Sequence, residues 1–350
     1  MAPLLEARNL RKVYTKRSGF FGPTDENVAL DNFSFSVGGD EPVFIAIAGE
    51  SGSGKTTLAQ MLLGFVPPTS GSILYRGQDI HHLNGPDQMQ FRQDVQAIFQ
   101  DPFAVYNPFY KVDHILSTPI RKFGLASSRQ DAENLILDAL AAVGLRPEDT
   151  LGRYPHQLSG GQRQRITVAR TLLLRPKLVI ADEPVSMVDA SLRATILESM
   201  YNVHQQYGIS FLYITHDLTT AYQVSDSIVI LYQGIVAEAG DVDRIIKEPQ
   251  HPYTQELVRS IPLPNIDKQW IQGDDSMGTE AVDTITPQVV VGCKYAARCP
   301  YVMDRCHAIQ PPLYQVDPRQ VAACYLYDTT PTLEDDNLTD TLHTRPELRR

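Results

Sequence analysis

The chain has 350 residues, of which 43% are hydrophobic and 21% charged, and its net charge is −10. This length predicts one main domain with an appendage. No apolar run approaches the ~18 residues that cross a bilayer, and residues 1–8 do not resemble a signal peptide, so we expect a cytoplasmic protein. The acidic charge and the absence of Lys/Arg blocks disfavour nucleic acid as a partner.

The first elements of the chain predict an α/β protein. Residues 4–14 and 28–37 are β-like, and a Gly/Pro/Lys-containing loop covers residues 16–27. Three continuous apolar runs suit strands that are buried on both faces of a parallel sheet. These runs are Val43–Ala48, Leu178–Asp182 and Phe211–Thr215. Each ends in polar residues at the carboxyl edge, where open α/β sheets place their ligands.

A glycine-rich segment directly follows the first buried run and precedes a predicted helix. It matches the pattern G-x-x-x-x-G-K-[ST] of a phosphate-binding loop. Its backbone N–H groups would surround a phosphate, Lys55 would neutralise the β and γ phosphates, and the Thr56 hydroxyl would bind Mg²⁺. The predicted nucleotide-binding residues here are Gly49, Glu50, Ser51, Gly52, Ser53, Gly54, Lys55, Thr56 and Thr57.

A helical insertion is predicted over about residues 102–165, because Ile136, Leu140 and Val143 repeat at helical spacing and no buried-strand run occurs there. Near its end, Ser159, Gly160, Gly161 and Gln162 precede a predicted helix. A serine hydroxyl and glycine N–H groups at a helix start can form a second anion site. The same residues can simply cap the helix.

Two acidic residues close the second buried run. Asp182 is suited to hold Mg²⁺ directly or through water, and Glu183 to orient and polarise an attacking water molecule. Capping of the following helix is the alternative. The third run is followed by a predicted helix, a hairpin around Gln233-Gly234 and a helix from about Asp241.

The composition changes beyond Pro262. Residues 264–290 are polar and acidic and predict a linker, and the tail from Asp328 is predicted to be disordered. All four cysteines lie in between, and a reducing cytosol makes disulfides unfavourable, so this grouping indicates a metal or cluster site. The cysteines are Cys293, Cys299, Cys306 and Cys324.

With its phosphate-binding loop, the segment Leu158–Gln162 and the acidic pair in this order, the chain resembles the ABC ATPase family. The resemblance implies an α/β fold, a P-loop ABC ATPase domain with a mixed sheet core, an antiparallel β subdomain and a helical insertion. It would occupy residues 1–262, with a helical subdomain at about 102–165. A linker and small Cys-rich extension would follow at 263–327, and a disordered tail at 328–350.

The resemblance also implies roles for single residues. Gln100 would be the Q-loop glutamine, which meets Mg²⁺ and water, and His216 the switch histidine, which contacts the γ-phosphate. Tyr14 would stack on the adenine, although aromatic residues at such positions are commonly core. In a head-to-tail dimer, Ser159, Gly160, Gly161, Gln162 and Asp189 of one subunit would complete the ATP site of the other. The D-loop before Asp189 carries Met187 where relatives usually have alanine.

Further motifs point to one branch of that family. They are Tyr106-Asn107-Pro108, His251-Pro252-Tyr253-Thr254, Gly292-Cys293-Lys294 and Arg298-Cys299-Pro300. They resemble the ATPases of dipeptide, oligopeptide and nickel importers, some of whose relatives move oligosaccharides. Such importers pair two ABC ATPase subunits, as a homodimer or a heterodimer, at the cytoplasmic face of the membrane. Two permease subunits and an external substrate-binding protein complete them.

Two other classes remain as alternatives. A soluble ABC ATPase that acts on ribosomes or nucleic acid is disfavoured by the single ATPase domain, the absence of heptads and the acidic charge. A regulatory module without hydrolysis is disfavoured because Glu183 and His216 stand at their positions.

The cysteines are separated by 5, 6 and 17 residues, without the C-x₂₋₄-C pairs of zinc sites. Members of the importer family can carry a [4Fe–4S] cluster in this region, for which four thiolates are the expected ligands. Zinc and cysteines that only pack remain alternatives, and His307 is a competing ligand.

Overall fold

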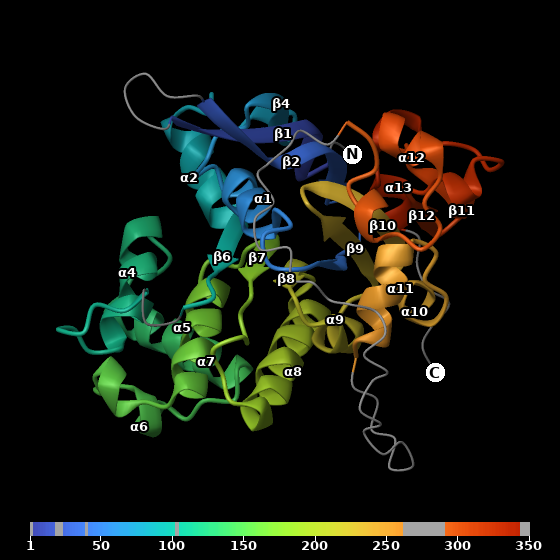
Figure 1. Ribbon diagram of the computed structural model, residues 1–350. Coiled ribbons are helices and arrows are strands. Elements are labelled where there is room, and N and C mark those ends of the chain that lie inside the picture. The colour runs from blue at the N-terminus through green and yellow to red at the C-terminus, as the bar shows by residue number, and fades with distance from the viewer. Residues whose placement is uncertain (1–2, 18–23, 39–40, 102–104, 262–290, 344–350) are drawn as a thin grey trace, which may run out of the picture.

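The computed structural model describes residues 3–17, 24–38, 41–101, 105–261 and 291–343. A mixed sheet lies at its centre, an antiparallel sheet covers one face and helices cover the other (Figure 1). The central sheet has the order β11 (Tyr314–Asp317), β12 (Gln320–Ala322), β10 (Ile235–Asp241), β9 (Ser227–Tyr232), β3 (Phe44–Ala48), β8 (Ser210–Thr215), β7 (Leu178–Asp182), β6 (Val95–Ile98). The antiparallel sheet has the order β2 (Thr24–Val37), β1 (Leu5–Arg17), β4 (Ser70–Tyr75), β5 (Gln78–Asp79).

The three predicted buried runs are β3, β7 and β8, which are parallel neighbours. Their side chains alternate between two hydrophobic clusters, because successive residues of a strand point to opposite faces. Phe44 and Phe211 stack at 4.9 Å in the cluster beneath the helices. Ile45 and Leu212 belong to the other cluster, between the two sheets. Burial on both faces explains the unbroken apolar sequence.

The longer helices are distributed along the whole chain. They are α1 (Lys55–Leu62), α2 (Gly85–Asp94), α4 (Asp113–Phe123), α5 (Arg129–Ala142), α7 (Gly160–Leu172), α8 (Ala190–Tyr207), α9 (Leu218–Val224) and α11 (Pro252–Arg259). The short ones are α6 (Pro147–Thr150), η1 (Pro155–Gln157), α10 (Val242–Lys247), η2 (Ala296–Arg298), α12 (Asp304–Ala308), η3 (Tyr325–Tyr327), η4 (Glu334–Asp336) and α13 (Thr339–His343).

The predicted helical insertion is present as α4, α5 and α6, and no strand interrupts the described residues 105–165. Leu140 and Val143 are buried, as their spacing predicted. By contrast, the predicted loop over residues 16–27 is too long. β1 continues to Arg17 and β2 begins at Thr24, because the two strands pair with each other up to these positions. Loop residues 18–23 and the predicted linker, at 264–290, lie outside the described residues.

The expected disorder from Asp328 is wrong as far as residue 343. Two leucines of this segment, Leu338 and Leu342, are buried in the cluster between the sheets. The Leu338 N–H donates to the Ser34 carbonyl at 3.0 Å, so that the segment is fixed to β2. Their i, i+4 spacing on a helical turn supplies an apolar face that the Thr/Asp-rich composition hides. Within the described residues, no helix has both the length and the apolar character needed to cross a membrane.

Candidate functional site

The phosphate-binding loop joins β3 to α1 in a conformation that requires glycine. Gly49 has a φ of 151°, and a Cβ there would lie 2.1 Å from the Leu231 carbonyl oxygen. Gly54 has a φ of 102°, and its Cβ would lie 2.2 Å from the Ala29 carbonyl oxygen. Gly54 is also the N-cap of α1, and no side chain caps this helix. Its first N–H groups are therefore suited to meet an anion.

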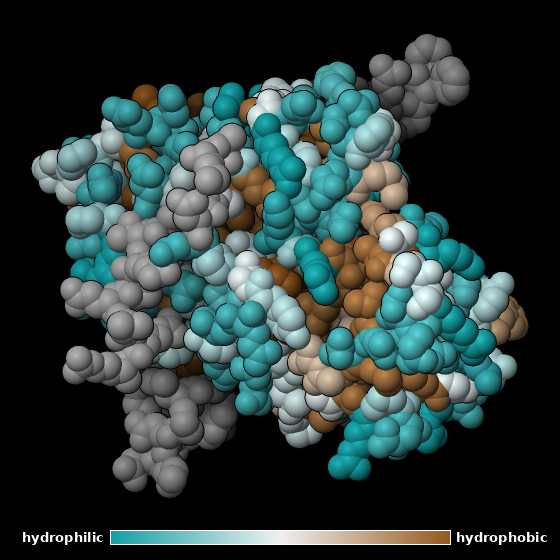
Figure 2. All heavy atoms as spheres, turned by 180° about the vertical axis from the view of Figure 1, so that it is seen from behind, coloured by the Kyte–Doolittle hydropathy of each residue, from teal (hydrophilic) through white to brown (hydrophobic). Residues whose placement is uncertain are grey.

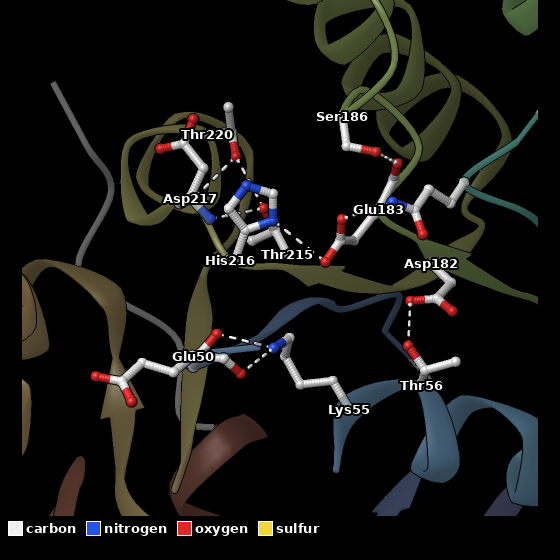
Figure 3. Close-up of polar contacts among 12 residues, drawn as sticks. Glu50, Lys55, Thr56, Asp182, Glu183, Ser186, Thr215, His216, Asp217 and Thr220 are labelled. Atoms are coloured by element: carbon white, nitrogen blue, oxygen red, sulfur yellow. Dashed lines mark hydrogen bonds and ion pairs between the residues drawn. The ribbon is translucent and has the colours of Figure 1, made fainter. Parts of the chain in front are cut away.

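Lys55 lies beneath this loop and is only 5% exposed. Its ammonium group donates to the carbonyl oxygens of Gly49 and Glu50, both at 2.8 Å (Figure 3). Burial lowers the pKa of Lys55, while the carboxylates of Glu183, Asp182 and Glu50 oppose that shift. The site thus holds a buried cation next to a ring of backbone dipoles, which suits a phosphate.

Thr56 and Asp182 bring two oxygen ligands together. The Thr56 hydroxyl donates to the Asp182 carboxylate at 3.5 Å (Figure 3). Burial raises the pKa of Asp182 and neighbouring Glu183 adds to the shift, whereas Thr56 and Lys55 lower it. Hydroxyl and carboxylate oxygens are the donors that Mg²⁺ prefers, so these residues fit that ion.

Glu183 is the centre of a second polar group. Its carboxylate lies 3.2 Å from His216 Nδ1 (Figure 3). The same carboxylate accepts from the Gln100 amide at 3.1 Å. Gln100, Glu183 and His216 follow β6, β7 and β8, which are adjacent parallel strands. Because carboxyl ends of parallel strands meet at one edge, residues 83 positions apart in the chain come into contact.

Glu183 has a left-handed backbone, with a φ of 45°. Its N–H donates to the Ile214 carbonyl at 2.9 Å, and its own carbonyl accepts from the Ser186 hydroxyl at 3.0 Å. Such a conformation is costly for a residue with a Cβ and persists where the surroundings enforce it. A carboxylate held in this way, with a glutamine and a histidine against it, is placed to orient a water molecule.

Ser159 and Gln162 form a reciprocal cap at the start of α7. The Gln162 N–H donates to Ser159 Oγ at 3.2 Å, and the Ser159 N–H donates to Gln162 Oε1 at 3.0 Å. The capping alternative therefore holds for the single chain. Their predicted role across a dimer, and that of Gly160 and Gly161, stays a prediction.

Two other predicted residues lie at the surface. Tyr14 is 41% exposed, which removes the alternative of a core residue, and the Lys12 ammonium lies 5.1 Å from its ring centroid. Met187 of the D-loop is 58% exposed, and Asp189 is the N-cap of α8. Their contacts with adenine or a partner subunit stay predictions.

The four cysteines are free thiols, two of them buried. Burial, together with the electrostatic influence of the Cys299, Cys293 and Cys306 thiols, raises the pKa of Cys324 to about 11. Four thiols have the donor chemistry of an iron–sulfur site. Nevertheless, nowhere in the described residues do three or more His, Cys, Asp or Glu side chains form a group that could hold a metal ion.

Two contacts of the phosphate-binding loop were not predicted. The Glu50 N–H donates to the Tyr253 hydroxyl at 3.0 Å, and Arg298 Nη1 lies 3.4 Å from the Glu50 carboxylate. In the sequence, Tyr253 and Arg298 lie in motifs that indicated only a branch of the ABC ATPase family. No local pattern marks contacts across 203 and 248 positions of the chain.

Comparison with known families matches two parts of the chain. Residues 30–186 match the family described as ABC transporter. Residues 237–306 match the oligopeptide/dipeptide transporter, C-terminal region.

Individual proteins match over nearly the whole chain. The dipeptide transport ATP-binding protein DppF of Escherichia coli is 38% identical, with 93% of this chain and 95% of that protein covered. The putative oligopeptide transport ATP-binding protein YkfD of Bacillus subtilis is 35% identical, with 95% and 98% covered. Among solved structures, the ATP-binding cassette MJ0796, in a dimeric state bound to ADP and Pi, matches with a TM-score of 0.57. The match is 24% identical and covers 68% of this chain and 98% of that one. This last likeness shows the fold.

Proposed function

The chain belongs to the ATP-binding subunits of ABC transporters of the oligopeptide/dipeptide type, and from this membership we propose that it powers the uptake of peptides through separate membrane subunits. It is an ATP hydrolase. The observation that carries the proposal is the meeting of Lys55, Asp182 and Glu183 at one sheet edge, within a phosphate-binding loop and against Gln100 and His216. Peptide cargo is supported by the names of the relatives DppF and YkfD.

For the chemistry, we propose that the loop residues Gly49–Thr57 bind the phosphates of ATP and that Lys55 neutralises them. Glu183 would accept a proton from the attacking water, held by Gln100 and His216. Thr56, Asp182 and Gln100 would hold Mg²⁺, which would supply positive charge to stabilise the phosphates. Catalysis in such a site comes from positioning and electrostatics, without a covalent enzyme intermediate.

We propose that two such subunits, identical or different, form the working unit. Ser159, Gly160, Gly161, Gln162 and Asp189 of one would meet the nucleotide of the other. The dimeric state of the structural neighbour MJ0796 supports this arrangement. Because Ser159 and Gln162 cap α7 reciprocally, their groups are already ordered before a second subunit arrives.

A hydrophobic groove supports docking of a membrane subunit. Figure 2 shows apolar side chains gathered in a hollow, and a groove of about 680 Å³ lies between α2, β6 and α4. Phe65 is 63% exposed there and Tyr110 50% exposed. Phe99 also lines the groove, directly before Gln100. We propose that an amphipathic helix of a permease subunit occupies it, at the cytoplasmic face of the membrane, with an external binding protein supplying cargo.

We also propose the domain division given by the sequence, with an ATPase domain at residues 1–262 and a Cys-rich region at 263–327. The pairing of β12 with β10 joins the two in one sheet. For the four cysteines we propose a [4Fe–4S] cluster, with zinc as the alternative. Their ligand chemistry and the electrostatic influence of the other three thiols on Cys324 support it. Anaerobic purification with iron, sulfide and zinc analysis tests this. One zinc and no iron per chain would contradict the cluster.

The ATPase assignment is tested by replacing Glu183→Gln in the transporter assembled with its membrane subunits. Turnover should fall about 100-fold or more, because a general base is lost, whereas ATP binding should persist. Glu198→Gln, on the exposed face of α8, is the matched control and should keep wild-type turnover. Unchanged ATP hydrolysis in Glu183→Gln would refute the role of Glu183.

Lys55→Ala tests the binding half of the proposal. Loss of a charge-assisted contact to phosphate should weaken ATP binding about 10- to 100-fold, measured by calorimetry on the isolated chain. Wild-type affinity in this variant would contradict the phosphate-binding assignment.

A further inference from the structure

The Cys-rich region touches the phosphate-binding loop through one arginine. Arg298, the last residue of η2, directs its guanidinium between two carboxylates. Nη1 lies 3.4 Å from Glu50 Oε1, and Nη2 donates to Glu256 Oε1 at 2.7 Å. Glu50 is the second residue of the loop, and its carboxylate points away from Lys55 (Figure 3). Arg298 therefore reaches the loop from outside the site.

The peptide groups of Glu50 link this outer contact to the buried lysine. The Glu50 N–H donates to the Tyr253 hydroxyl at 3.0 Å, and the Glu50 carbonyl accepts from Lys55 Nζ at 2.8 Å. The side chain, the N–H and the carbonyl of one residue are thus held by three different partners. A turn of Glu50 about its backbone would displace the oxygen that holds Lys55.

A second contact from the same region supports the loop at a second residue, Ser53. Lys294 Nζ donates to the Gln233 carbonyl at 2.7 Å, in the turn between β9 and β10. The next residue, Gly234, donates its N–H to the Ser53 carbonyl of the loop at 3.0 Å. Arg298 therefore braces the loop at Glu50, and Lys294 braces it at Ser53 through the turn between β9 and β10.

Aromatic packing makes this brace stiff. Tyr232, Tyr253 and Tyr295 come from β9, α11 and the Cys-rich region, with ring centroids 4.4 to 5.6 Å apart. Tyr295 contacts Glu256 through its hydroxyl, and the Arg298 guanidinium lies 5.7 Å from its ring centroid. The partners of Glu50 are thereby tied to one another, so that they move as a group.

We propose that Arg298 is a positioning residue for ATP: acting through Glu50, the Cys-rich region holds the phosphate-binding loop in its nucleotide-binding conformation. This inference rests on the proposed ATP site. Arg298 contacts Glu50 on the side of the loop away from Lys55, so its effect falls on nucleotide affinity. The step carried out by Glu183 is unaffected.

The test measures binding of ATP with Mg²⁺ to the full-length chain, and steady-state kinetics in the assembled transporter. Arg298→Ala should weaken ATP binding about three- to fivefold and raise KM for ATP by the same factor, with kcat unchanged, as expected for a half-exposed ion pair. Glu50→Ala should have the same effect. The double variant should bind ATP no more weakly than either single variant, because both single changes remove the same Arg298–Glu50 ion pair. Arg298→Lys should restore most of the affinity.

Arg305→Ala is the matched control. Arg305 lies in the same region, is 43% exposed against 45% for Arg298, pairs with Asp328 and donates to the Tyr325 carbonyl. The Arg305→Ala variant should lower the melting temperature about as much as Arg298→Ala and leave ATP affinity unchanged. Wild-type affinity and KM in Arg298→Ala, or equal losses in both variants, would overturn the proposal. A wild-type chain that does not bind ATP would instead overturn the ATP site itself.

Discussion

Two helices of this chain begin at predicted anion sites, and they begin in opposite ways. At α1 the N-cap is Gly54, with a φ of 102° and no capping side chain. At α7 the N-cap is Ser159, with a φ of −66° and a complete capping box with Gln162. The four N-terminal N–H groups of a helix need partners. The comparison indicates that α1 leaves these groups without a side-chain partner, whereas at α7 Ser159 and Gln162 supply one.

The largest expected difference between the N-termini of α1 and α7 comes from adding one methyl group to a glycine at each. Gly54→Ala places a Cβ 2.2 Å from the Ala29 carbonyl oxygen on a left-handed backbone, and Gly160→Ala meets nothing within 4 Å. We expect Gly54→Ala to abolish ATP binding and to lower the free energy of unfolding by about 1–3 kcal/mol. Gly160→Ala should fold as well as wild type. Thermal unfolding measures the stability of both variants, and ATP titration measures their affinity. If the two variants were equally stable and bound ATP equally well, the proposed difference between the N-termini of α1 and α7 would be wrong.

A smaller difference is expected when the cap of α7 is removed. Ser159→Ala should destabilise the chain by about 1 kcal/mol, as cap losses typically do, and should also reduce turnover of the assembled transporter. Binding of ATP to the isolated chain should stay unchanged. Ser128→Ala is the control, because Ser128 caps α5 by accepting from the Asp131 N–H at 3.1 Å, far from any predicted site. If both variants keep full turnover, Ser159 acts only as a cap.

The smallest effect is a difference in pH dependence. Burial lowers the pKa of Lys55 below its ordinary value of 10.5, so its charge is lost earlier as pH rises. ATP affinity should therefore decline as pH rises through that lowered pKa. The unliganded fold should gain stability over the same window, because the folded state binds fewer protons there than the unfolded state. Lys55→Met should remove both trends, measured by titration and thermal unfolding. The start of α7 should show no such pH dependence, because Ser159 and Gln162 carry no titratable group.

The residues that meet at the carboxyl ends of β6, β7 and β8 could be predicted because each lies in a short local pattern. Glycines that need left-handed backbone, an acidic pair behind an apolar run and a histidine behind the next run are all readable within a few positions. The parallel order of β3, β8, β7 and β6 then brings them together. The sequence contains this information because burial on both faces makes those strands continuously apolar.

The brace on the phosphate-binding loop could not be predicted in this way. Arg298 and Glu50 are separated by 248 positions, and each alone looks like an ordinary surface charge. The tail was missed for a related reason. Leu338 and Leu342 are only two apolar residues among polar ones, and their burial depends on a surface built by β2, β9 and β10. The composition of a segment does not reveal the surface, built by distant parts of the chain, against which the segment packs.

The late position of β12 and α13 bears on how the protein is made. β12 pairs along β10, and the Leu342 carbonyl accepts from the Ser227 hydroxyl at 2.8 Å. While a ribosome is still translating these last segments, the nascent cassette carries an open sheet edge beside an uncovered apolar surface. A premature stop before residue 320 would leave that state permanent. Such truncated products should aggregate or be recognised by chaperones and proteases, even though every motif for ATP chemistry has already been synthesised.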